Sequence, residues 1–389
     1  LKADLGALEF GSSHAPILVL PVLSTKAEDF VGVALVNSEA PLWADARSQS
    51  PMYQAQPTRL TFHGSHSGTD TVQNLDLPAG RQYSALLSEI ADRGPGWLEI
   101  HPENPAIQGF TLLGDFEQRK LDGISLSPEL SSVLYFPEVA PVSGRVQIFL
   151  VNPNSAQVSL TMELYTGGNF RTTPGPSIPA QGSVVIDPLD YFSGLSGAAY
   201  LKISASEPVF GLEVVGNEET VAALPGLDYE PSEFPVPLYG AQLAFGPDIE
   251  TWIHVINPGP AQPVTFAAYD ERGNLVASQT QSLESKGALR EAASSFFGVE
   301  NLVGWLSVFP GSGRVLGSLH FTSPEGQLSA ALPLEADLAT EFVLSHVAQT
   351  EGIFTGITLL NPGGETALVS IEVFSREGER TGLALTELA

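Results

Sequence analysis

"TWIHVINPGPAQPVTFAAYDERG", residues 251–273, contains a complete β-hairpin motif, and the chain repeats it. The other copies are "RVQIFLVNPNSAQVSLTMELYTGG" at 145–168 and "TGITLLNPGGETALVSIEVFSREG" at 355–378. In each copy the first strand ends at an Asn-Pro pair, because proline lacks an N–H and fixes φ. The asparagine side chain can bond the backbone two residues on and so start the turn. We therefore expect structural roles for three residues, Asn152, Asn257 and Asn361.

The hairpin motif recurs with a nearly constant period. Asn152 and Asn257 are 105 residues apart, and Asn257 and Asn361 are 104 apart. Asn37, in "FVGVALVNSEAP", lies 115 residues before Asn152, and the extra length falls in a loop insertion at 41–70. A glycine turn follows each hairpin, in "LPAGRQYSALL", "IPAQGSVVIDPL" and "LESKGALREAA". An aromatic strand with a glycine beyond it comes next, and these glycines are Gly109, Gly211 and Gly317. The three markers together predict a repeated unit of about 100 residues.

Each unit has the pattern of a β-sandwich. Short stretches alternate between apolar and polar residues, so one face of each predicted strand is apolar. Two such sheets can bury their apolar faces against each other. A propeller blade has about 40–50 residues, which is half of this period, and strands do not alternate with long helices as in βαβ folds. The predicted inward-facing residues are Val158, Leu160, Met162, Leu164, Val264, Phe266, Ala268, Val369, Ile371 and Val373.

Two further features recur within the unit. Trp97, Tyr200 and Trp305 occupy one position of the repeat, and we expect each ring to fill the core of its sandwich. A short helical turn is expected after each glycine turn, in "ALLSEI", "LDYFSG" and "EAASSFFG".

The pattern "LVNP…Y-x-x-x-G…LPAxG…GW" resembles the tandem immunoglobulin-like or fibronectin-like modules of bacterial secreted and surface proteins. The immunoglobulin Cys–Trp–Cys signature is missing, so the resemblance is to the sandwich architecture. It implies roles in binding, spacing or assembly. The predicted fold class is all-β, with tandem Ig-like β-sandwich domains, about three full repeats plus incomplete terminal pieces. The predicted boundaries are an N-terminal strand segment at 1–23, repeats at 24–126, 127–230 and 231–336, and an incomplete repeat at 337–389.

The composition excludes several classes of function. With 17 Lys+Arg against 44 Asp+Glu, the net charge of −27 opposes the phosphate neutralisation that nucleic-acid binding requires. An acidic surface of this kind can attract divalent cations. The chain has no cysteine, which excludes disulfides and Cys-type zinc sites. No apolar stretch reaches the roughly 18 residues of a membrane helix. We therefore expect neither a nucleic-acid partner nor a membrane span.

The sequence predicts no enzyme, because no catalytic motif is present. A Gly-x-Ser-x-Gly elbow, a phosphate loop and an HExxH pair are all missing. His63 and His66 lie three residues apart in "HGSH", but no adjacent carboxylate motif completes a zinc site. His254 occupies a variable strand position and is not expected to be a ligand. Asp187 and Asp190 are expected to cap a helical turn. We predict no catalytic residue, no cofactor and no metal ligand.

The two ends of the chain show a different irregularity. "LGALEFGS" at 5–12 matches "LGSLHFTS" at 316–323 in five of eight positions, and Gly6 lies 103 residues before Gly109. The last unit stops before its glycine turn. A half-built sandwich leaves unpaired strand edges, which can accept a strand by donor-strand complementation. We expect residues 1–23 of one subunit to pair with 340–389 of the next. The predicted assembly strand contains Leu5, Gly6, Leu8, Phe10, Ile17 and Val19, and the predicted acceptor residues are Ile357, Leu359, Val369, Ile371 and Val373.

Head-to-tail contacts that do not close generate filaments. The sequence therefore predicts a non-enzymatic structural protein, extracellular or at the cell surface, that assembles with copies of itself. Three alternatives stay open. The chain can be a window cut from a longer array of repeats, or the non-catalytic part of a larger secreted protein. It can also be a surface adhesin or carbohydrate-binding module, with exposed aromatic residues in the insertion loop at Trp43, Tyr53 and Phe62.

Overall fold

A computed structural model describes residues 18–22, 29–38, 55–64, 70–91, 96–102, 106–117, 120–126, 130–140, 144–167, 169–349 and 355–388. Over these residues the chain is all-β, as the sequence predicts, with helices of only four or five residues. The strand pairings there are antiparallel.

One arrangement of eight strands recurs along the chain, and we name its strand positions a to h in chain order. Strands a, f, c and d form one sheet in that order, which we call the afcd sheet. Strands e, b, g and h form the ebgh sheet. Immunoglobulin constant domains have sheets A-B-E-D and C-F-G instead. The units therefore have the sandwich architecture with a strand order of their own.

The first unit has the sheet orders β1-β6-β3-β4 and β5-β2-β7-β8. β1 belongs to the predicted terminal segment 1–23, yet it pairs with β6 of this unit, Leu18 opposite Ile100. The elements are β1 (Leu18–Val22), β2 (Asp29–Asn37), β3 (Ala55–Gly64), β4 (Thr71–Pro78), β5 (Gln82–Leu86), α1 (Leu87–Ile90), β6 (Gly96–Pro102), β7 (Ile107–Asp115) and β8 (Leu121–Ser125).

The second unit combines strands f and g in one long strand. Residues 199–205 of β14 pair with β11 in the afcd sheet, and residues 210–216 pair with β10 in the ebgh sheet. The elements are β9 (Ser131–Phe136), β10 (Arg145–Asn152), β11 (Leu160–Thr166), β12 (Asn169–Pro174), β13 (Gly182–Ile186), α2 (Pro188–Tyr191), β14 (Ala199–Gly216) and β15 (Val221–Pro225).

The third unit repeats the first, with sheet orders β16-β21-β18-β19 and β20-β17-β22-β23. Its elements are β16 (Leu238–Phe245), β17 (Glu250–Asn257), β18 (Gln262–Asp270), β19 (Leu275–Leu283), β20 (Gly287–Ala292), α3 (Ala293–Phe297), β21 (Leu302–Pro310), β22 (Leu316–Thr322) and β23 (Ser329–Pro333). In the fourth unit, described residues form only strands c and d, as the hairpin β24 (Ala367–Phe374) and β25 (Arg380–Leu388). The three helices coincide with the predicted helical turns.

The alternating residues face the interior as predicted in the second and third units. Val158, Leu160, Met162 and Leu164 are buried, and so are Val264, Phe266 and Ala268. Each set belongs to the apolar core between the two sheets of its own unit.

The repeated asparagines hold two turns together, which confirms their structural role. Asn152 and Asn257 are fully buried at the ends of their b strands. The Nδ2 of Asn257 donates to the carbonyl of Pro260 at 2.7 Å and to that of Glu284 at 3.0 Å. Its bond partners lie in the b–c turn and in the d–e turn. The Nδ2 of Asn361 likewise donates to Glu365 O at 2.7 Å.

The repeated glycines allow strand g to approach strand b closely. Gly109 lies opposite Leu35, Gly211 opposite Leu150 and Gly317 opposite Val255. A Cβ at Gly317 would lie 2.5 Å from the carbonyl oxygen of His254, so a side chain does not fit there. This crowding explains why the glycine recurs with the period of the fold.

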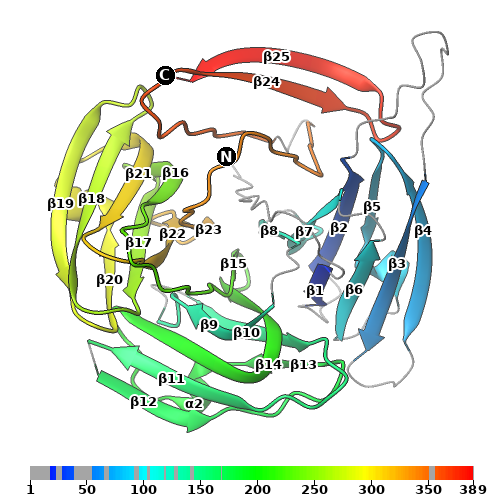
Figure 1. The fold of residues 1–389 in the computed structure, drawn as a ribbon, viewed down its shortest axis with the longest axis horizontal. Coiled ribbons are helices and arrows are strands. Elements are labelled where there is room, and N and C mark those ends of the chain that lie inside the picture. Colours follow the sequence, from blue (N-terminus) through cyan, green and yellow to red (C-terminus); the bar gives the residue numbers. More distant parts are fainter. Residues whose placement is uncertain are drawn as a thin grey trace.

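The units surround a common centre, so that the last unit meets the first (Figure 1). Strands d and e lie on the outside, and the h strands β8, β15 and β23 lie nearest the centre. β15 contacts both β8 and β23. Small side chains pack where β15 and β23 meet, at Ala222 and Ala331. The sheets therefore radiate from the centre as propeller blades do, although each repeat contributes a two-sheet sandwich. The sequence pattern did not predict this ring.

Candidate functional site: the surfaces between units

In the first three units, the face of the afcd sheet that points away from its sandwich core carries a pair of stacked rings. Its members lie opposite each other on strands c and f. Ring centroids are 4.3 Å apart in His63–Trp97, 4.8 Å in Tyr165–Tyr200 and 4.0 Å in Tyr269–Trp305. Trp97 and Tyr200 are buried, as expected, at 1% and 2% exposure, whereas Trp305 is only half-buried. Tyr200 packs against Ile256 and Leu316 of the next unit, so these rings fill the space between units and not the sandwich core.

Each buried ring of this kind also bonds the next unit. The indole Nε1 of Trp97 donates to Gln181 O at 3.1 Å, and the hydroxyl of Tyr200 donates to Lys286 O at 3.1 Å. Gln181 and Lys286 occupy the same place in successive d–e turns, and both have left-handed backbone with φ of 51° and 60°. The ammonium of Lys286 lies over the rings of Tyr165 and Phe170. The left-handed turn thus presents a carbonyl to the preceding unit.

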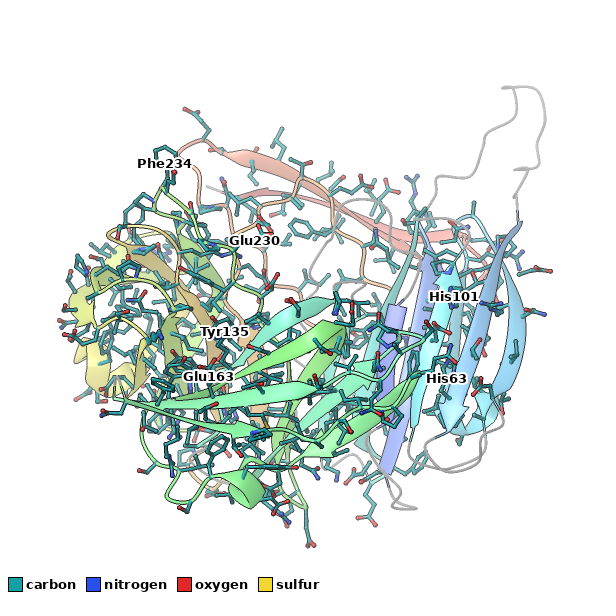
Figure 2. The ribbon with its side chains drawn as sticks, turned by 60° about the horizontal axis from the view of Figure 1, so that its bottom comes forward. His63, His101, Tyr135, Glu163, Glu230 and Phe234 are labelled. Atoms are coloured by element: carbon teal, nitrogen blue, oxygen red, sulfur yellow. The ribbon has the colours of Figure 1, made fainter. Side chains whose placement is uncertain are left out.

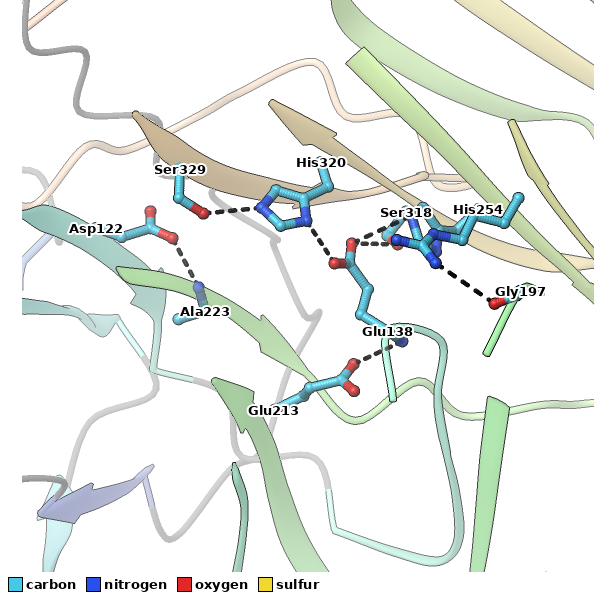
Figure 3. A network of polar contacts seen from close by, with 10 residues as sticks. Asp122, Glu138, Gly197, Glu213, Ala223, His254, Ser318, His320 and Ser329 are labelled. Atoms are coloured by element: carbon cyan, nitrogen blue, oxygen red, sulfur yellow. Dashed lines mark hydrogen bonds and ion pairs between the residues drawn. The ribbon is translucent and has the colours of Figure 1, made fainter. Parts of the chain in front are cut away.

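A buried polar network joins the second unit to the third (Figure 3). Glu138 follows β9 and is 1% exposed. Its Oε2 is 2.5 Å from Nδ1 of His320, and its Oε1 is 3.9 Å from Nε2 of His254. Ser318 Oγ donates to Glu138 Oε1 at 3.5 Å. The backbone N–H of Glu138 donates to Glu213 Oε2 at 3.2 Å.

The network shifts the pKa values of two neighbouring carboxyl groups, Glu138 and Glu213, in opposite directions. Burial opposes ionisation of Glu138, but His320 and His254 outweigh it and lower the pKa of Glu138 to about 2. Burial raises the pKa of Glu213 well above its usual value, and the charge of Glu138 raises it further. Burial lowers the pKa of His254 to about 4. Because these side chains are enclosed between two units, their arrangement fits a structural connection and offers no approach to a substrate.

His63 lies in a second polar group, on the first unit (Figure 2). Its Nδ1 is 3.2 Å from Asp70, and its Nε2 is 3.1 Å from Glu99. His101 Nε2 is 3.0 Å from the other oxygen of Glu99. Burial opposes ionisation of Glu99, yet the hydrogen bonds from His63 and His101 lower its pKa. Sequence spacing missed this group because His63 lies on β3, whereas Glu99 lies on β6 and Asp70 just before β4.

No set of three or more His, Asp or Glu side chains in the described part of the chain is placed to hold a metal ion. His66 lies outside the described residues. Asp187 caps α2 as predicted, accepting from Leu189 N at 2.9 Å, with Asp190 in the first turn.

The fourth unit rests against the first and the third. The backbone N–H of Gln82, at the start of β5, donates to Arg376 O at 3.3 Å. The side chain of Gln82 donates to Ser345 O. On the other side of the fourth unit, Thr358 Oγ1 donates to Gln242 Oε1 at 3.4 Å. The first unit contacts the fourth through its d–e region. The third unit contacts the second through the same region of its own fold. The ring is therefore continuous through four units.

The fourth unit leaves its predicted acceptor residues uncovered. Ile357 is 41% exposed and Val373 is 37% exposed, and Leu359, Val369 and Ile371 are half-buried. Residues 355–362 form no strand, although the corresponding residues of the third unit form β17. On the other face of the hairpin Leu368 is 80% exposed. Apolar side chains are thus accessible on both faces.

The structure places one residue of the predicted assembly strand. Val19 lies in β1 opposite Glu99, within its own first unit. Leu5, Gly6, Leu8, Phe10 and Ile17 lie outside the described residues. Of the aromatic residues predicted for a carbohydrate site, Trp43 and Tyr53 also lie outside them. Phe62 lies in β3 and is only 6% exposed, because it packs in the first core, so its expected exposure was wrong.

Comparison with known proteins gives little. No family model matches the chain, and no curated protein matches it. One solved structure with some similarity is a tetra-tandem repeat from the extending region of a large adhesion protein. It shares 12% identity, with a TM-score of 0.13, over 82% of this chain and 74% of that chain. The described residues contain no helix with the length and hydropathy of a membrane span.

Proposed function

We propose that this chain is a non-enzymatic structural protein of the extracellular space or cell surface, of the adhesion-repeat kind, whose fourth unit is completed by an added β-strand. The first three units have buried cores and are joined to one another by hydrogen bonds. The fourth unit offers what strand addition needs, because the described residues 355–361 form no strand and lie beside accessible apolar side chains.

The observation that carries this proposal is a difference between equivalent strands. In β18 the three inward residues Val264, Phe266 and Ala268 are fully buried. In β24 the corresponding Val369 and Ile371 are only half-buried, and Val373 is exposed. The same alternating pattern is therefore covered in one unit and uncovered in the other. Exposed apolar surface of this kind marks an interaction site.

The acidic composition supports the same class of function. A net charge of −27 keeps a repeat protein soluble and opposes non-specific association. Specific strand pairing can act against this repulsion because backbone hydrogen bonds and apolar contacts are short-ranged. The sequence-based hypothesis has a second copy supply the strand, which would give head-to-tail chains. That hypothesis stays a prediction.

Hydrogen exchange measured by mass spectrometry tests the proposal on the unmodified chain. Peptides covering 355–361 should exchange slowly, because an added strand would bond their amides. Peptides covering β17 and β18 serve as the reference for a complete unit. Exchange of 355–361 at the rate of an unstructured peptide would contradict the proposal.

A further inference from the structure

We propose that residues 5–12 of this same chain form strand g of the fourth unit, paired with residues 355–361, so that the chain closes its own ring. This inference rests on the proposed function, because it names the strand that the open unit accepts. It replaces the second copy with a segment of the same polypeptide.

The position of residues 5–12 in the chain favours this pairing. The sequence of 5–12 matches strand g of the third unit, β22, and it comes directly before the first unit in the chain. These residues therefore belong to whichever unit precedes the first. In the ring, the fourth unit takes that place, with Arg376 bonded to Gln82 of β5. The fourth unit of a second copy would have to displace it.

The register of the third unit also fits residues 5–12. In the third unit Val255 lies opposite Gly317 and His254 lies opposite Ser318. Transferred to the fourth unit, this register places Leu359 opposite Gly6 and Thr358 opposite Ala7. The first two units also have leucine opposite the g-strand glycine, at Leu35 and Leu150. Gly6 would provide the close approach that this position requires.

Residues 5–12 also carry apolar side chains at the positions that are buried in the third core. Leu319 and Phe321 of β22 are fully buried, next to Ile253 and Val255 of β17. Their counterparts in 5–12 are Leu8 and Phe10, and the counterparts of the β17 pair are Ile357 and Leu359. In the same register, an added strand g would place Leu8 opposite Ile357 and Phe10 opposite Thr355, on one face of the sheet.

An engineered disulfide tests this register directly. The chain has no cysteine, so the double variant Ala7→Cys and Thr358→Cys introduces its only two thiols. Residues directly opposite in an antiparallel pair have Cα atoms about 4.5–5.5 Å apart, within disulfide range. We expect oxidation to give a monomer linked within one chain, seen as a mobility shift without reductant, at a yield independent of protein concentration. The matched control pairs Ala7→Cys with Ser370→Cys on the exposed face of β24 and should not cross-link.

Each other outcome overturns the inference. A disulfide-linked dimer or ladder that increases with concentration would show that a second copy donates the strand. Absence of any disulfide would show that residues 5–12 do not pair in this register. Hydrogen exchange of the unmodified chain separates the two proposals. Slow exchange at 355–361 without cross-linking leaves the proposed function standing with another donor, and fast exchange contradicts both.

Discussion

At the scale of single residues, Gln181 and Lys286 adopt a backbone conformation that costs energy. A non-glycine residue in the left-handed region loses roughly 1–2 kcal/mol. The first unit has Gly80 at the same place, with φ of 72°. In this conformation the backbone carbonyl accepts a hydrogen bond from the ring of the preceding unit. That hydrogen bond offsets the cost of the left-handed conformation.

The effect of substitutions at Gln181 on the free energy of unfolding should depend on the backbone conformation and not on the lost side chain. Gln181→Val should lower the free energy of unfolding by about 2 kcal/mol, since a β-branched residue fits the left-handed region poorly. Gln181→Gly should leave it unchanged or raise it, because the carbonyl that accepts from Trp97 remains. Urea denaturation measures both. Equal losses in the two variants would show that the side chain itself holds the interface.

The two buried carboxyl groups at the second interface should respond oppositely to substitution. Glu138→Gln should cost about 3 kcal/mol at neutral pH, because it removes the charged partner of His320. Glu213→Gln should not destabilise the protein there, because glutamine resembles the protonated acid that burial favours. Urea unfolding at pH 7.5 compares them, and a larger loss for Glu213→Gln would contradict the assigned protonation states.

The sign of the pH dependence follows from the same groups. The pKa of His254 is lowered to about 4, so the unfolded chain takes up its proton first as the pH falls from about 6.5, and stability decreases down to about pH 4. The pKa of Glu138 is lowered to about 2, so its contribution is lost as the pH falls from about 4.5 to 2. Glu213 has a raised pKa, and its contribution is present at acidic pH and is lost as the pH rises. Replacing Glu213 by glutamine should therefore gain more at pH 8 than at pH 4.5.

At the scale of elements, the β24–β25 hairpin has the sequence pattern of a strand with one buried face, but that face is accessible. An isolated two-stranded hairpin is marginally stable in water. Its alternation is that of β18, which lies between two partner strands, β19 and β21. The proposed strand g would pair with 355–361 in the other sheet, so it would support β24 by covering its inward face.

Two alanine substitutions in β24 should therefore differ. Ile371 corresponds to the buried Phe266, and in a completed unit Ile371→Ala should lower local stability by about 2–4 kcal/mol. Leu368→Ala, at a residue that is 80% exposed, should change it by less than about 0.5 kcal/mol. Hydrogen exchange of 367–388 gives both values. Similar small effects at the two positions would indicate a hairpin that stays uncovered.

The sequence predicts the elements better than their surroundings. Its asparagine, glycine and aromatic markers predicted the period, the sandwich and the helical turns, because each reflects a local requirement of backbone or packing. It did not predict that the second face of several sheets is also buried. β17 shows the reason, since Ile253 and Val255 face the sandwich core while His254, between them, faces the second unit. A polar residue at a buried interface gives the same alternation as one in water.

The polar network was missed for a related reason. Glu138 and His320 are 182 positions apart, and Glu138 belongs to no motif. Only the ring brings β9 of one unit to β22 of the next. The repeat could have suggested the ring pairs, because His63, Tyr165, Tyr269 and Phe374 all stand at the end of strand c. In the fourth unit Phe374 is 52% exposed.

At the scale of the whole molecule, the account depends on a ring of four units. Buried rings bond left-handed turns between the first and second units and between the second and third, and the fourth unit bonds the first through Arg376 and Gln82. A ring of this kind limits assembly through the chain ends, since the first unit already carries a neighbour on its ebgh side. A string of separate sandwiches would leave that side open to another molecule.

The distance between the first and fourth units in solution tests this most directly. Spin labels at Arg81→Cys and Glu379→Cys, both exposed and in the turns that meet, can be measured by pulsed electron paramagnetic resonance at high dilution. A pair at Asn169→Cys and Ser285→Cys gives the reference for the second and third units. The ring predicts one narrow, short distance for both pairs. A short distance for the reference pair with a long or broad one for the first pair would contradict it.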